Sequence, residues 1–183
     1  QSQGTDHSSA RAARSLQLCA EDNMVVAMPS TPATYFHLLR RHMRDGVQKP
    51  MVIFTPKSLL RLKAAVSATA DFTEGSFRPV LDDATVADPA TVTRVVLCAG
   101  KVYYDLAKER EKNPASTVAI TRLERLYPHP LAEVTATLER YPNATDVVWV
   151  QEEPANMGAW TTLALALPEV LPAGRALRRV SRR

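Results

Sequence analysis

The sequence contains few cysteines, glycines and aromatic residues, and it has no long apolar run. Its two cysteines, Cys19 and Cys98, lie far apart, and neither has a second Cys or a His at a spacing that would bind zinc. We therefore expect two reduced, buried thiols and no metal site. The six glycines form no glycine-rich loop that could surround a phosphate. No stretch approaches the roughly 18 apolar residues that a membrane helix requires.

The remaining composition is that of a globular protein, with 45% apolar and 23% charged residues. A chain of 183 residues can form one large or two small domains. The net charge of +4 comes from dispersed arginine pairs and not from a basic stripe interleaved with aromatics, which argues against nucleic acid as a partner. The first twenty residues lack the apolar core of a signal peptide. We expect a cytoplasmic or mitochondrial matrix protein with no membrane partner.

Short apolar strands alternate with amphipathic helices along the chain. Thr31 followed by Pro32 predicts a helix start, since the hydroxyl can accept a hydrogen bond from a free amide and proline suits the first helical position. Gly46 is expected to end that helix. The same Thr-Pro pattern at 55–56 predicts a helix through KSLLRLK. Apolar runs predict buried strands of a mostly parallel sheet with helices on both faces, at residues 24–28, 50–54, 94–98, 118–120 and 147–150.

The pattern is interrupted once in the middle of the chain and is incomplete at its start. Between residues 69 and 92 the periodicity fades into acids, threonines and turn residues, which predicts an interdomain linker between residues 1–68 and 93–183. Within it, only 77–81 resembles a strand. A helix is predicted from Ser8 or Ser9 to about Glu21. The chain begins without Met and in the middle of a pattern, so we expect it to be a piece of a longer polypeptide.

Several side chains could carry chemistry. In GTDHSSAR, residues 4–11, His7 lies between an acid and two hydroxyls, where an imidazole can exchange a proton or bind an anionic group. On local sequence alone it is more often a solvated loop residue before a helix cap. Lys57 at a predicted helix start could mark an anion site. The adjacent acids Glu152 and Glu153 follow a strand, but such pairs more often divide between a salt bridge and a helix cap.

Six segments in order along the chain resemble one enzyme family. They are QGTDHSSAR, LCAEDNM, PSTPATYFHLLRR, TPKSLLR, AGKVYYDL and WVQEEPANMGAW. Together they are similar to the C-terminal part of the thiamin diphosphate-dependent, decarboxylating component of the 2-oxoglutarate dehydrogenase complex, over nearly the whole chain. The resemblance implies an α/β fold in which residues 1–68 are the later half of a pyrimidine-binding domain. Residues 93–183 are then a transketolase C-terminal-like three-layer αβα domain with a mostly parallel sheet.

The resemblance also implies an activity. In this family 2-oxoglutarate is decarboxylated on thiamin diphosphate held with Mg²⁺, and the four-carbon unit passes to a lipoyl group on a succinyltransferase partner in the citric acid cycle. The enzyme is expected to be a homodimer. His7 matches the histidine of the family's HSSAR loop, which implies a catalytic and substrate-binding role, with Ser8 beside it as a substrate contact.

The sequence departs from the family in ways that limit these expectations. We find no GDG motif followed by a Mg²⁺-ligating Asn, and no Glu that would activate the pyrimidine ring, so the cofactor should be bound mainly by residues outside this chain. The chain alone should then be inactive. The loop before His7 also differs, because Thr5 stands where the family usually has Pro.

A regulatory or structural role is the alternative. Some bacterial relatives bind acetyl-CoA in this region, and Arg41 matches one of the basic residues of that site. Other matching positions carry different residues here, which predicts little acetyl-CoA affinity: Val25, Ser76, Pro79, Arg125, Ala132 and Glu133. Arg41, Arg61 and Arg125 nevertheless remain candidates for contacts with the phosphates of CoA or an adenine nucleotide. The third hypothesis is a purely structural dimerisation domain.

Overall fold

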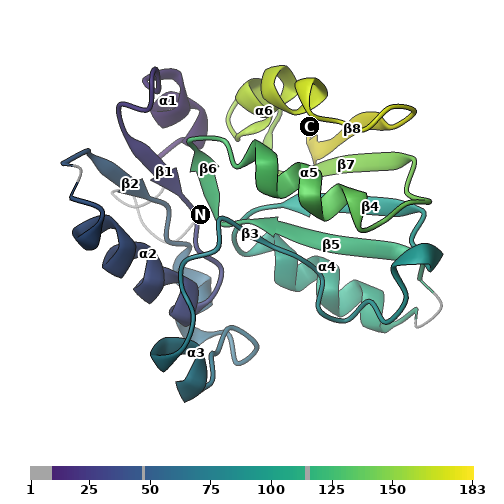
Figure 1. The fold of residues 1–183 in the computed structure, drawn as a ribbon, viewed down its shortest axis with the longest axis horizontal. Helices are drawn as coiled ribbons and strands as arrows, with labels where there is room; N and C mark the ends of the chain where they lie inside the picture. The colour runs from purple at the N-terminus through teal and green to yellow at the C-terminus, as the bar shows by residue number, and fades with distance from the viewer. Residues whose placement is uncertain (1–9, 47, 114–115) are drawn as a thin grey trace.

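A computed structural model describes residues 10–46, 48–113 and 116–183, which form two sheets with helices around them (Figure 1). The smaller sheet has three strands in the order β2-β1-β6. Its members are β2 (Met51–Ile53), β1 (Val25–Ala27) and β6 (Arg125–Tyr127). β1 is parallel to β2 and antiparallel to β6. Among the described residues, no helix is both long enough and apolar enough to cross a membrane.

The helix beside this sheet forms where the sequence predicts it. α2 (Pro32–Arg44) begins after Thr31, whose side-chain oxygen accepts a hydrogen bond from the backbone N–H of Thr34. It ends before Gly46, which has a φ of 65°. The predicted helix at 57–63 is wrong in kind: η1 (Lys57–Arg61) is a 3₁₀ turn with no buried residue, so no apolar face stabilises a longer helix.

The larger sheet has five strands in the order β3-β5-β4-β7-β8. They are β3 (Val80–Leu81), β5 (Val118–Leu123), β4 (Arg94–Cys98), β7 (Asp146–Pro154) and β8 (Ala176–Arg182). The pairs within β5-β4-β7-β8 are parallel, and β3 is antiparallel to β5. The expected mostly parallel sheet is thus present.

Helices cover both faces of the five-stranded sheet because successive strand residues point to opposite sides. On one face, Val96 and Cys98 of β4 pack with residues of α4 (Val102–Glu111). On the other face, Val95 and Leu97 share a core with Val134 and other residues of α5 (Leu131–Glu139) and α6 (Trp160–Ala166). η3 (Leu167–Glu169) follows α6 directly.

A single residue separates two consecutive strands that belong to different sheets. Glu124 separates β5, in the five-stranded sheet, from β6, in the three-stranded sheet. The segment 69–92 contains α3 (Thr69–Thr73), β3 and η2 (Pro89–Thr91), and β3 joins the larger sheet. α1 (Ala12–Gln17) ends earlier than predicted, before Glu21 and Asp22, whose φ values of 47° and 56° are incompatible with a continuing helix.

Candidate functional site

The sequence-predicted catalytic residue His7 and its neighbour Ser8 lie outside the described residues. The helix that follows them is placed firmly. Ala12 and Leu16 of α1 are buried in the largest core cluster, and the backbone N–H of Ala13 donates to the carbonyl of Met157 at 3.3 Å. α1 therefore lies beside α6, against the segment that contains the QEEPANMGAW motif (Figure 1).

A buried carboxylate connects the two sheets. Glu124 is fully buried, and its two oxygens accept hydrogen bonds from Ser30, at 2.7 Å from the backbone nitrogen and at 2.6 Å from the hydroxyl. Ser30 lies just before α2, beyond the carboxyl end of β1. Burial raises the pKa of Glu124, although the bonds from Ser30 and the charge of Arg122 oppose this rise. We call the group of Ser30, Arg122, Glu124 and Tyr104 the junction.

The rest of the junction binds Ser30 from β5 and from helix α4. Arg122 Nη1 donates to the Ser30 hydroxyl at 3.0 Å, and the Tyr104 hydroxyl donates to the Ser30 carbonyl at 2.7 Å. The Arg122 guanidinium also lies over the ring of Tyr103, 4.0 Å from its centroid. The same region requires Gly100, because a Cβ there would meet the Met28 sulfur at 2.4 Å. The carboxyl ends of β1 and β4 are thus packed directly together.

The motif after β7 is organised by one glutamine. Gln151 accepts hydrogen bonds through Oε1 from the Trp149 indole and the Trp160 backbone N–H, and it donates through Nε2 to the carbonyls of Glu153 and Pro154. Gly158 is required because a Cβ would lie 2.5 Å from the Gln151 amide. Glu152 forms an ion pair with Lys101, the residue just before α4, which supports the structural interpretation of that acid.

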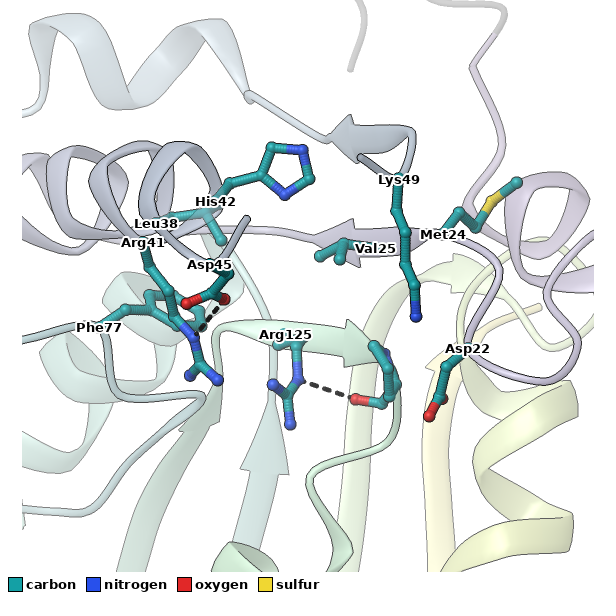
Figure 2. Close-up of a pocket in the computed structure, with 11 residues that line it drawn as sticks. Asp22, Met24, Val25, Leu38, Arg41, His42, Asp45, Lys49, Phe77 and Arg125 are labelled. Atoms are coloured by element: carbon teal, nitrogen blue, oxygen red, sulfur yellow. Dashed lines mark hydrogen bonds and ion pairs between the residues drawn. The ribbon is translucent and has the colours of Figure 1, made fainter. Parts of the chain in front are cut away.

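A cleft lies between α2, β6 and the turn before β1, as Figure 2 shows. Arg41 and Arg125 direct their guanidinium groups toward the same open space, and Lys49 and Asp22 lie across from them (Figure 2). Its volume is about 220 Å³, which is below the usual range of pockets for whole drug-sized ligands but sufficient for a phosphate group. The complete lining is Asp22, Met24, Val25, Leu38, Arg41, His42, Asp45, Lys49, Phe77, Arg125 and Pro128.

The two arginines of the cleft differ in how they are held. Arg125 is half-buried, and its Nε donates to the Pro128 carbonyl at 2.9 Å. Burial lowers the pKa of Arg125, and the nearby charge of Arg41 acts in the same direction. Arg41 is exposed and forms an ion pair through Nε with Asp45 at 3.2 Å. The third predicted phosphate contact, Arg61, lies elsewhere, in a surface depression with Lys57 and Ser58.

Comparison with known proteins identifies the family of this fold. The family described as 2-oxoglutarate dehydrogenase C-terminal matches residues 66–183, and the transketolase pyrimidine-binding domain family matches residues 1–63. The chain belongs to the 2-oxoglutarate dehydrogenase C-terminal family. This confirms the resemblance found in the sequence, and the α/β fold is transketolase-like as that resemblance implies.

Named proteins that match nearly the whole of this chain agree with this family. The chain is 55% identical over 186 residues to the multifunctional 2-oxoglutarate metabolism enzyme of Mycolicibacterium vanbaalenii. It is 54% identical over 182 residues to the 2-oxoglutarate dehydrogenase E1/E2 component of Corynebacterium glutamicum. Both alignments cover 99% of this chain but only 15% of the relative. The chain thus spans about a seventh of the length of these bacterial proteins.

The junction was not predicted from the sequence of this chain. The available signal was an acid in the segment TRLERLY, where Leu123 and Leu126 are apolar and Glu124 separates two strands. Its partner Ser30 is 94 residues away, so no local pattern connects them.

Proposed function

We propose that this chain is a segment of a thiamin diphosphate-dependent 2-oxoglutarate dehydrogenase component that decarboxylates 2-oxoglutarate. The observation that carries the proposal is the pair of family matches in tandem, a pyrimidine-binding domain followed by the 2-oxoglutarate dehydrogenase C-terminal family. The names of the similar bacterial proteins support 2-oxoglutarate as the substrate. We further propose a cytoplasmic homodimer that passes its product to a lipoyl-bearing succinyltransferase in the citric acid cycle.

When bound, thiamin diphosphate would supply the carbanion and the electron sink of the reaction. Among the described residues, no group of three or more His, Cys, Asp or Glu side chains could hold a metal ion, and the sequence has no GDG motif followed by a Mg²⁺-ligating Asn. We therefore assign the diphosphate and Mg²⁺ mainly to residues outside this chain. By itself, the chain is expected to be inactive.

His7 is the residue of this chain to which we assign the chemistry, with Ser8 as a substrate contact. Two observations support the assignment: the match of the HSSAR segment, and the firm attachment of α1 to the core directly after it. A histidine there could pair its imidazolium with a substrate carboxylate or exchange a proton with it.

The test uses the full-length enzyme. His7→Ala should lower kcat/KM for 2-oxoglutarate by at least about a hundredfold, the usual contribution of a positioned acid–base group. Gln17→Ala, an exposed change on α1, serves as the matched control and should leave turnover unchanged. Unchanged turnover in His7→Ala would refute the assignment.

The cleft supports a second candidate function, that of an anion-binding regulatory site. The convergence of Arg41, Arg125 and Lys49 on one open space favours it. Titration of the full-length protein with AMP, CoA and acetyl-CoA separates the ligands, and the sequence departures predict weak acetyl-CoA binding. If none of the three is bound below millimolar concentration, this function is excluded.

A further inference from the structure

The segment that contains β8, the edge strand of the five-stranded sheet, is strongly basic. Residues 170–183 contain five arginines and no acid, so this segment carries a charge of +5, and the rest of the chain, whose net charge as a whole is +4, sums to −1. Half of the segment is β8, the last strand in the sheet order, which holds three of the five arginines. The arginine pairs that look dispersed in the sequence are therefore partly gathered on one strand.

The outer edge of β8 is available for pairing in the described part of the protein. β8 pairs with β7 on one side, and no described strand pairs with the other. Its arginines lie on both faces of the sheet, since adjacent residues alternate: Arg178 and Arg182 share one face, and Arg179 has the opposite one. Val180, between them, is 55% exposed. An edge strand of this length presents unpaired backbone donors and acceptors.

Only part of this charge is neutralised within the chain. Arg178 shares the carboxylate of Asp146 with Arg94. Arg179 lies over the Trp160 ring at 5.6 Å from its centroid, and no carboxylate among the described residues forms an ion pair with it. Arg182 is exposed at the end of the strand. Charges that serve only to prevent edge-to-edge aggregation would need no aromatic support beneath them.

We propose that the free edge of β8 is a docking surface for an extended acidic segment of a partner protein, which adds to the sheet as a sixth strand. Backbone hydrogen bonds would supply the pairing, and carboxylates on alternate faces would meet Arg179 and Arg182. Nucleic acid fits less well, because the Arg179 guanidinium already lies over one face of the Trp160 ring, where a base would otherwise stack.

The proposal is tested with the full-length protein and a labelled peptide, Glu-Glu-Val-Glu-Glu-Val-Glu-Glu, by fluorescence anisotropy. Binding should weaken as salt rises from about 0.05 M to about 0.5 M. Arg179→Glu with Arg182→Glu should raise Kd at least about tenfold by placing like charges across the interface. The control, Lys63→Glu with Lys108→Glu, makes the same charge change at exposed sites elsewhere and should shift Kd less than about twofold.

Two further probes decide between strand addition and simple charge attraction. The same peptide N-methylated at alternate residues lacks the donors for one ladder edge, so its affinity should fall about tenfold with the unmodified protein. Equal affinity of the methylated peptide would overturn the proposal. So would absence of peptide binding, or tighter binding of a thymidine octanucleotide than of the acidic peptide.

Discussion

The junction and the cleft hold their charged side chains in different ways. In the junction, both oxygens of Glu124 are occupied by Ser30, and Arg122 reaches the same hydroxyl. In the cleft, two guanidinium groups and an ammonium group face open space, and the nearest compensating acid for Arg41 is the exposed Asp45. A buried carboxylate whose two oxygens both accept hydrogen bonds fixes the position of the elements that it joins, whereas cations that converge on open space are suited to bind an anion.

The largest effect is expected from breaking the junction. Glu124→Ala leaves the N–H and the hydroxyl of Ser30 without their acceptor, which should destabilise this region by about 1 to 3 kcal/mol for each group left unsatisfied. Hydrogen exchange of the backbone around Ser30 in the intact protein measures the loss as faster local opening. Glu124→Gln is the matched control, because its amide can still accept from the N–H and contact the hydroxyl. Equal exchange in the alanine variant and the wild type would show that the junction does not hold the sheets together.

The second effect is the pH dependence of the same carboxyl group. Burial raises the pKa of Glu124 above its ordinary value of 4.5, so between these two values the folded state binds more protons than the unfolded state. Its stabilising contribution is therefore present below 4.5 and is lost as the pH rises through the raised pKa. Glu124→Gln cannot titrate. The difference in thermal midpoint, variant minus wild type, should increase with pH across this window, and a constant difference would contradict the assignment.

The pKa of Asp83 shifts in the direction opposite to that of Glu124. Burial alone would raise its pKa, but the hydrogen bonds from Arg110, Ile120 and Thr85 outweigh burial and lower it. Its stabilisation is present above its ordinary value of 3.8 and is lost as the pH falls through the lowered pKa. The thermal midpoints of Asp83→Asn and the wild type, compared as the pH falls, therefore separate the contribution of Asp83 from that of Glu124.

The junction and the cleft also show how much of the structure could be predicted from the sequence. The cap at Thr31, the helix end at Gly46 and the apolar strand at 94–98 depend on nearby residues, and the structure confirms them. β6 was missed because its three residues lie between Glu124 and Pro128 and form a strand only by pairing with distant β1. Arg41 and Arg125 could be proposed singly, but their convergence depends on that same pairing.

The third effect concerns the cleft. Pyrophosphate serves as the probe for an anion bound in the cleft. Arg125→Met should weaken its binding by about tenfold, or about 1.4 kcal/mol, through loss of a charge-assisted contact. Folding should be little affected, because a cation whose pKa is lowered by burial already disfavours the folded state. Isothermal titration of the full-length protein measures the affinity. Arg61→Met removes an arginine from the separate depression and should change nothing. Equal losses in the two variants would show that the cleft is not the binding site.

The smallest effect tests whether Asp45 weakens anion binding in the cleft. The Arg41–Asp45 pair is exposed, with 47% and 51% of the two side chains accessible, so it contributes little stability. Asp45→Asn keeps the shape and removes a negative charge that competes with any anion for Arg41. Pyrophosphate affinity should rise by about twofold, within the energy of an exposed ion pair, and the gain should disappear at high salt. Glu109→Gln, which breaks the exposed pair with Lys112 on α4, is the control. An equal gain there would mean that net charge, and not the position of Asp45, determines the affinity.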